Sequence, residues 1–155
     1  MQQKTQVTAS GGLFPNNMVI GLDLGDRWSR YCMLDNGGAV LEENRVRSTE
    51  QALEERFGTL SATRIVIETG THSPWVSRLL TAMGHSVVVA NARRLRMIYE
   101  SNRKNDRLDA RMLARLGRAD VELLAPVRHR SARAQADLAV VRGRDALVAA
   151  RTQLM

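Results

Sequence analysis

The sequence has little cysteine, few aromatic residues and no long apolar run. Its one cysteine, Cys32, excludes a disulfide framework and a thiolate metal cluster, and its strand-like surroundings predict a small core residue. Aromatic residues make up only 4% of the chain, which argues against a stacking platform for single-stranded nucleic acid. We therefore expect Trp28 and Trp75 to lie in the core.

Targeting signals are missing as well. Residues 1–17 are polar and contain glycine, so they predict a flexible lead-in rather than a signal peptide. No apolar stretch approaches the ~20 residues that a membrane span needs, and we expect a soluble, cytoplasmic protein. At 155 residues and 44% hydrophobic, the chain is long enough for one domain with a substantial core.

Lysine is rare and the basic charge is uneven. Of the 23 basic residues 21 are arginine, and the formal net charge is +7. Residues 1–92 carry 8 basic and 9 acidic residues, whereas residues 93–155 carry 15 and 7. Arginine suits bidentate phosphate contacts, so the second part favours a nucleic-acid partner. Codon bias in a GC-rich genome would account for much of the preference for arginine, but not for the asymmetry.

The order of predicted elements indicates an α/β domain with a mixed sheet. Two capping signals predict helix starts: Ser48-Thr49-Glu50-Gln51 opens a helix that stops near Gly58, and Ser73-Pro74 opens one that closes at Gly84. Ser73 is expected to be the cap rather than a nucleophile. The strands are predicted at about 18–24, 27–34, 39–47, 63–68 and 87–89, and the chain is helical and basic from about 92.

Four carboxylates lie where stability alone would not place them. Asp23 interrupts one apolar run, Glu68 ends another, and Asp106 and Asp109 are three residues apart. Asp23 and Glu68 come at the carboxyl ends of strands, where open α/β sheets place their sites. Because Mg²⁺ prefers hard oxygen ligands, four carboxylates that meet would form a magnesium site for phosphate chemistry.

The spacing of apolar residues predicts which side of the helix starting near Asn105 faces the core. Its leucines and Met112 fall within an arc of roughly 140°, with Asp109 inside the arc and Asp106 at its edge. The opposite side carries Arg107, Arg111, Arg115 and Arg118. One aspartate therefore turns toward the core and the arginines turn outward.

A purely structural interpretation treats each acid separately. Asp23 would cap the Gly21–Gly25 turn, Glu68 would pair with His72 or Arg64, and Asp106 would be a helix N-cap. Spacing alone leaves this interpretation open, because acid pairs in arginine-rich helices are common in salt-bridge ladders.

Basic residues flank the acid pair and are candidates for nucleic-acid binding. Phosphates held there would pass the proposed metal ions, although a solvated charged face is the alternative. The candidates are Arg93, Arg94, Arg96, Arg103, Lys104, Arg107 and Arg111.

Three motifs together resemble a known family. They are Gly21-Leu22-Asp23-Leu24-Gly25, Ile67-Glu68-Thr69-Gly70 and the segment Arg103-Lys104-Asn105-Asp106-Arg107-Leu108-Asp109-Ala110. Over about residues 18–130 the chain resembles the DEDD transposases of bacterial insertion sequences, insertion-sequence family one-ten, related to the Piv DNA invertases. The first motif also opens sugar-kinase and chaperone ATPases, but an actin-like half would need a second glycine-rich loop and a second lobe.

The resemblance implies a RuvC-like domain with the ribonuclease H fold, a mixed five-stranded sheet flanked by helices. It implies that Asp23, Glu68, Asp106 and Asp109 form a catalytic tetrad that binds Mg²⁺, with Mn²⁺ able to substitute. The implied activity is cleavage and exchange of DNA strands. Some members are guided by an element-encoded bridge RNA, so DNA and a guide RNA are the expected partners.

The last segment, 131–155, is expected to be a helix. Heptad spacing is followed by Ala134, Leu138, Val141, Val148 and Met155 and is interrupted by Asp145 and Thr152, so a coiled coil and a simple packing helix are equally open. Family members continue through a coiled coil into a domain with a catalytic serine. We thus expect this chain to be the RuvC-like half, forming a homo-oligomer through that helix. The alternative function is a non-catalytic nucleic-acid-binding or assembly module.

Overall fold

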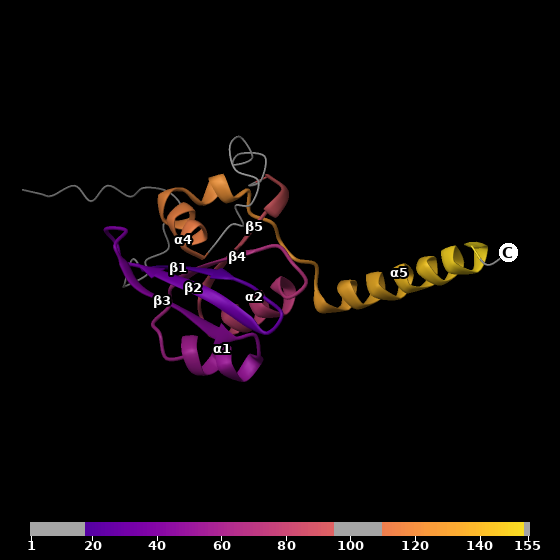
Figure 1. Ribbon diagram of the computed structural model, residues 1–155, viewed down its shortest axis with the longest axis horizontal. Coiled ribbons are helices and arrows are strands. Elements are labelled where there is room, and N and C mark those ends of the chain that lie inside the picture. The colour runs from indigo at the N-terminus through magenta and orange to yellow at the C-terminus, as the bar shows by residue number, and fades with distance from the viewer. Residues whose placement is uncertain (1–17, 95–109, 154–155) are drawn as a thin grey trace, which may run out of the picture.

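The protein is built on one five-stranded sheet (Figure 1). The structure, a computed structural model, describes residues 18–94 and 110–153. The strand order is β3-β2-β1-β4-β5; β1 pairs antiparallel with β2 and β2 with β3, whereas β1–β4 and β4–β5 are parallel. The strands are β1 (Val19–Asp23), β2 (Trp28–Leu34), β3 (Val40–Arg47), β4 (Arg64–Glu68) and β5 (Ser86–Ala90).

Helices cover both faces of this sheet (Figure 1). A three-stranded meander followed by two parallel strands, with helices between and after them, is the ribonuclease H-like topology, so the predicted fold class is confirmed. The described helices are α1 (Glu50–Phe57), α2 (Ser73–Ala82), α4 (Ala110–Ala119), the 3-10 turn η1 (Val121–Leu124) and α5 (Ala132–Gln153).

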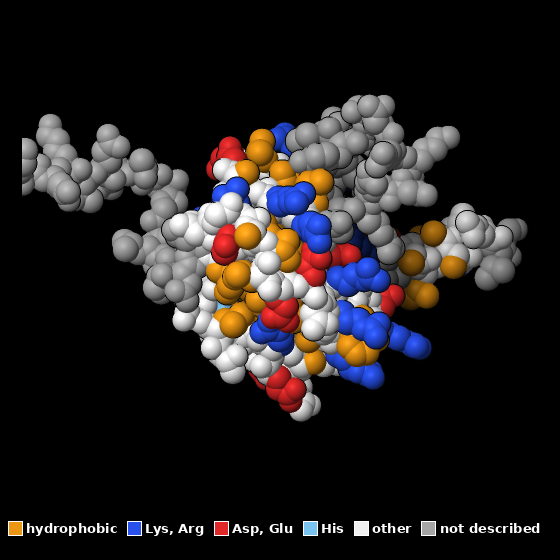
Figure 2. All heavy atoms as spheres, turned by 60° about the vertical axis from the view of Figure 1, so that its left-hand side comes forward, with side chains coloured by type: hydrophobic (Ala, Val, Ile, Leu, Met, Phe, Trp, Pro, Cys, Tyr) orange, Lys and Arg blue, Asp and Glu red, His pale blue; other side chains and the backbone are white. Residues whose placement is uncertain are grey.

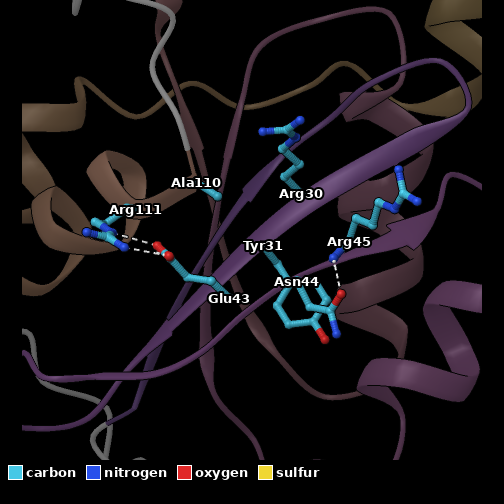
Figure 3. A pocket seen from close by; sticks show the side chains of 7 residues that line it. All are labelled: Arg30, Tyr31, Glu43, Asn44, Arg45, Ala110 and Arg111. Atoms are coloured by element: carbon cyan, nitrogen blue, oxygen red, sulfur yellow. Dashed lines mark hydrogen bonds and ion pairs between the residues drawn. The ribbon is translucent and has the colours of Figure 1, made fainter.

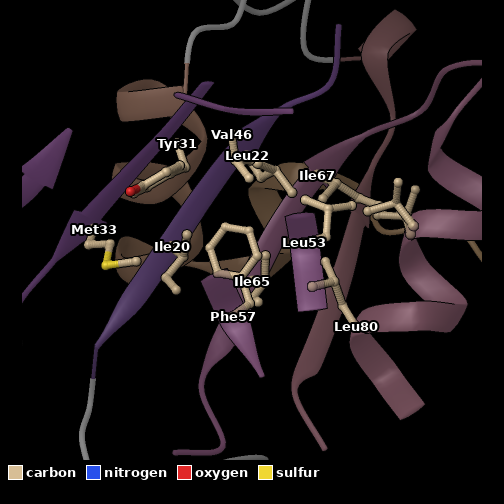
Figure 4. Close-up of a cluster of buried hydrophobic side chains, with 12 residues drawn as sticks. Ile20, Leu22, Tyr31, Met33, Val46, Leu53, Phe57, Ile65, Ile67 and Leu80 are labelled. Carbon is tan, nitrogen blue, oxygen red and sulfur yellow. The ribbon is translucent and has the colours of Figure 1, made fainter. Parts of the chain in front are cut away.

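The larger core lies between the sheet and the helices α1 and α2. Strand side chains alternate between the two faces, so Ile20 and Leu22 of β1 point to this core together with Ile65 and Ile67 of β4. Phe57 of α1 is fully buried against them (Figure 4). The other residues of each strand therefore face α4.

Helix α4 packs on the opposite face with almost no separation from β1. A Cβ atom on Gly21 would lie 1.9 Å from the Ala110 carbonyl oxygen and 2.5 Å from the Ala114 backbone nitrogen. Further along, a Cβ on Gly117 would lie 2.3 Å from Cγ2 of Val66. Small residues on both elements thus let the backbone of the helix rest on the central strand.

The contacts also fix the direction of α4. Its first described residue, Ala110, lies at Gly21, whereas Gly117 lies near Val19 and accepts a 2.9 Å hydrogen bond from Arg64. Arg118 reaches the carbonyl of Asn36 in the β2–β3 turn, beside the start of β1. The helix therefore runs antiparallel to β1, with its N-terminus toward the carboxyl edge of the sheet.

Several local predictions are confirmed. Thr49 is the N-cap of α1 and accepts from the Ala52 nitrogen, and Cys32 is fully buried.

The prediction that Ser73 caps α2 is wrong. Ser73 is the first residue of α2, and its hydroxyl binds the backbone of Gly70 instead. His72 takes the N-cap position without a side-chain hydrogen bond to the helix backbone.

The prediction that Trp28 lies in the core is wrong. Its ring is 39% exposed on the α4 face of β2, because α4 covers only the other end of that strand. Trp75 is half-buried and packs against the larger core.

Helix α5 projects away from the sheet (Figure 1). Its described side chains are mostly exposed, including Val140, Val141, Leu147 and Val148 at 52–74%. No described helix is both long and apolar enough to cross a membrane.

The contact at Gly21 predicts a strong effect of a single methyl group. Gly21→Ala places Cβ against the α4 backbone, which cannot rotate away as a side chain can, so we expect a loss of about 3 kcal/mol in the free energy of unfolding. Urea denaturation followed by circular dichroism measures it. Gly143→Ala is the control, because nothing lies within 4 Å of its Cβ position and alanine favours helix. Equal stability of the two variants would show that α4 does not rest on β1.

Candidate functional site

Two of the four predicted carboxylates lie side by side in the strand register. Asp23 ends β1, Glu68 ends β4, and Leu22 pairs with Ile67 immediately before them. Because Leu22 and Ile67 both face the larger core, alternation turns Asp23 and Glu68 to the α4 face. Both are half-buried. Two acidic side chains thus share one face at the carboxyl edge of the sheet.

The start of α4 lies close to this edge. Ala110 sits at Gly21, two residues before Asp23, and the helix axis points from there toward the carboxyl edge. The other two predicted ligands, Asp106 and Asp109, lie outside the described residues. In the sequence they precede Ala110 by four residues and by one.

The loop after β4 is held by backbone and hydroxyl groups. The Thr69 nitrogen donates to the Ala90 carbonyl at 3.0 Å, and the Thr69 hydroxyl accepts from the Ala92 nitrogen. Four residues further on, the Ser73 hydroxyl accepts from the Gly70 nitrogen and donates to its carbonyl. This network fixes the backbone that follows Glu68.

The two partners suggested for Glu68 in the purely structural interpretation, His72 and Arg64, have other contacts in the structure. His72 Nε2 lies 3.2 Å from Asp26, and the Arg64 guanidinium donates to the Gly117 carbonyl. Both residues therefore make contacts with other groups.

The donor chemistry at this edge fits a hard divalent cation. Asp23 and Glu68 supply carboxylate oxygens, which Mg²⁺ prefers. Among residues 18–94 and 110–153, no group of three histidine, cysteine or acidic side chains could hold a metal ion. The two described acids are half of the predicted set, so a complete shell needs ligands from beyond the described residues.

A bidentate ion pair ties α4 to the edge strand β3. The Arg111 guanidinium donates through Nε and Nη2 to the two carboxylate oxygens of Glu43 (Figure 3). This hydrogen bonding lowers the pKa of Glu43 below its ordinary value. The predicted nucleic-acid residue Arg111 therefore has a structural partner in β3.

The other predicted nucleic-acid residues are only partly described. Arg93 and Arg94 are exposed, and their backbone nitrogens donate to the Asn91 side chain just after β5. Arg96, Arg103, Lys104 and Arg107 lie outside the described residues.

The structure adds arginines that the sequence reasoning did not single out. A pocket of about 460 Å³ is lined by Arg30 of β2, Arg45 of β3 and the start of α4 (Figure 3). Arg47 lies on the same face of β3, two residues beyond Arg45. In the sequence, these arginines occupy alternate positions of two predicted strands. Residues 1–92 are nearly neutral as a whole, so their charge did not draw attention to these arginines.

The sheet topology and the carboxylates at the ends of its central parallel strands define a domain of the ribonuclease H-like class. A family model described as DEDD_Tnp_IS110, Transposase, matches residues 20–155. The chain belongs to this IS110 family of DEDD transposases, which confirms the resemblance drawn from its motifs.

The chain also resembles a solved structure. The structure is similar to the RuvC structure of Thermus thermophilus, with a TM-score of 0.39 and 13% sequence identity over 71% of this chain and 99% of that chain. The strand order and register, not this distant likeness, define the fold. No curated protein matches the chain.

The Glu43–Arg111 pair predicts a pH dependence of stability. The pKa of Glu43 is lower in the folded protein than its ordinary value of 4.5. The stability that ionised Glu43 contributes is therefore fully present above pH 4.5 and is lost as the pH falls through the folded pKa. We expect the melting temperature of Glu43→Gln to lie below that of the parent at pH 7 and to converge with it in acid. Thermal unfolding from pH 7 to below the folded pKa measures this.

The matched control is Glu54→Gln, an exposed acid on α1. It should track the parent across the same pH range. If the melting temperatures of Glu43→Gln and the parent differ by the same amount at every pH, the ionised Glu43–Arg111 pair does not stabilise the fold.

Proposed function

We propose that Asp23, Glu68, Asp106 and Asp109 bind Mg²⁺ and that this centre cleaves and exchanges DNA strands. The observation that supports it most is that Asp23 and Glu68 each follow directly after the paired residues Leu22 and Ile67, on the face against which α4 packs. Asp109 and Asp106 follow within one and four residues of Ala110. At up to ~3.5 Å per residue, both are within reach of Asp23.

Each element has a distinct role in this proposal. Asp23 ends the central strand β1, between β2 and β4, and its carboxylate would be a ligand of the metal. Glu68 is fixed by the bonded loop that follows it. The α4–β1 contact holds Ala110 against Gly21, two residues before Asp23. When bound, the metal neutralises charge that develops on the attacking and leaving oxygens of phosphate transfer.

The exposed arginines support nucleic-acid partners in this proposal. Arg93, Arg94 and Arg115 are exposed and belong to the strongly basic part of the chain. We extend the proposal to a guide RNA, whose phosphates and shape such residues would contact.

A second candidate function, a non-catalytic assembly module, is favoured by α5. This 22-residue helix has four large apolar side chains that are at least half exposed, in two pairs seven residues apart. A heptad repeat of that kind suits a partner helix. We propose that α5 forms a homo-oligomeric coiled coil in either function.

The metal proposal predicts the behaviour of two carboxylate variants. Asp23→Asn and Asp109→Asn each remove a charged ligand, so we expect Mn²⁺ affinity to fall at least tenfold in titration calorimetry, since a lost charge-assisted contact costs about 1.5–3 kcal/mol. Asp26→Asn is the matched control, because Asp26 is 97% exposed just beyond β1. Mn²⁺ binding unchanged in both test variants would show that the centre does not bind metal.

The oligomer proposal predicts a different response. Val140→Glu combined with Leu147→Glu puts charges on the exposed apolar side of α5, so we expect the mass from light scattering to fall to that of one chain. Ala139→Glu with Ala146→Glu keeps the charge change and the seven-residue spacing, on a different side of the helix. A parent that is already monomeric at high concentration would contradict oligomerisation through α5.

A further inference from the structure

Three arginines and one tryptophan form an exposed surface on the α4 face of β2 and β3. The register pairs Arg30 with Arg45 and Trp28 with Arg47, and all four side chains are exposed. Figure 3 shows Arg30 and Arg45 extending to the same side of the two strands. We call Trp28, Arg30, Arg45 and Arg47 the arginine ladder.

The ladder starts next to the carboxylate edge. Arg30 pairs directly with Asp23 across β1 and β2, so Asp23, Arg30 and Arg45 occupy one row perpendicular to the strands. With strands ~4.8 Å apart, the Cα atoms of Arg30 and Arg45 lie about 5 and 10 Å from that of Asp23. Positive charge thus extends outward from the candidate metal centre.

This arrangement is unfavourable for the folded protein alone. Like charges directly opposite each other on neighbouring strands destabilise a sheet, and Arg30 faces Arg45. None of the three ladder arginines forms an ion pair with another described residue. Charges on an edge strand discourage aggregation, which would explain Arg45 and Arg47. Arg30 of the inner strand β2 has Asp23 opposite it on one side and Arg45 on the other, so only one of these two neighbours offsets its charge.

Trp28 holds two of the guanidinium groups in place. Arg45 Cζ lies 4.6 Å and Arg47 Cζ 4.9 Å from the centre of the indole ring. A guanidinium stacked on an aromatic ring keeps its N–H donors directed outward in its own plane, where they can bind phosphate. Trp28 is therefore a positioning residue for the arginines.

Arginine side chains also gather visibly on one flank of the molecule (Figure 2). The described residues contain no lysine, so each basic side chain in that view is an arginine. Such a flank attracts a polyanion along its length.

We infer that the arginine ladder binds the phosphate backbone of the DNA strand whose reacting phosphate lies at Asp23. DNA is the strand that the proposed reaction cuts, so this inference rests on the proposed function. Phosphates on one side of the reacting position lie over Arg30 and Arg45, and the Trp28 ring aligns the outer contacts. Binding is independent of base sequence, since only phosphates are contacted.

The test measures binding without metal, so that its result is separate from that of the metal proposal. A labelled single-stranded DNA of mixed sequence is titrated with the 155-residue chain in EDTA, and anisotropy is recorded over a salt series. Arg45→Gln combined with Arg47→Gln should weaken binding about tenfold or more and reduce the salt slope by about 1.4, that is ~0.7 for each lost phosphate contact. Arg30→Gln should reduce the slope by about half as much.

The controls separate this role from a general loss of charge or of structure. Arg133→Gln with Arg142→Gln removes the same charge from exposed positions of α5 and should change affinity little. Trp28→Ala should weaken binding, whereas Trp28→Phe should restore it, since phenylalanine also accepts a stacked guanidinium. Unchanged melting curves confirm that each variant is folded.

Three outcomes would overturn the inference: a salt slope unaffected by the ladder variants, an equal loss in the α5 control, or a loss seen only with an RNA of the same sequence. If Asp23→Asn abolishes Mn²⁺ binding while the ladder variants bind DNA normally, only the inference that the arginine ladder binds DNA is wrong. If the ladder variants lose DNA binding while Asp23→Asn leaves Mn²⁺ binding unchanged, only the proposal of a metal centre is wrong.

Discussion

The close packing of α4 on β1 is the constraint on which the rest of the structure depends. Because Gly21 has no side chain, the α4 backbone reaches the central strand, and Gly117 allows the same approach to β4. That contact buries one face of three strands and orients the helix so that its N-terminus points to the carboxyl edge. The direction of α4 matters for the proposed site, because Asp106 and Asp109 come shortly before Ala110 in the sequence.

The two faces of the sheet differ in the kinds of side chain that they carry. The face under α1 and α2 is closed by large apolar residues such as Phe57 and Leu80. On the opposite face, the described residues Ala110–Ala119 of α4 pack over β1, β2 and β4. The same face carries Asp23 and Glu68 at the carboxyl edge and the exposed arginine ladder beside them.

Sequence reasoning succeeded where local patterns carry the information. Alternating apolar runs located the strands, the capping box located α1, and the phase of α4 correctly turned Leu113 inward and Arg115 outward. It failed for Trp28, because the burial of an aromatic residue depends on where a helix from a distant segment ends. It also misplaced the cap of α2, since Ser73 is the first residue of the helix and its hydroxyl bonds to the Gly70 backbone.

The sequence by itself determined the family and the order of the elements, and it singled out the four carboxylates of the proposed site. Those features depend on residue types and short spacings, which need no knowledge of distant contacts. Only the tertiary structure decided that Asp23 adjoins both Glu68 and Arg30, and that arginines from a neutral stretch of sequence converge on one face. The physical reason is strand pairing: hydrogen bonding between strands sets the register, and that register brings together side chains that the sequence keeps many residues apart.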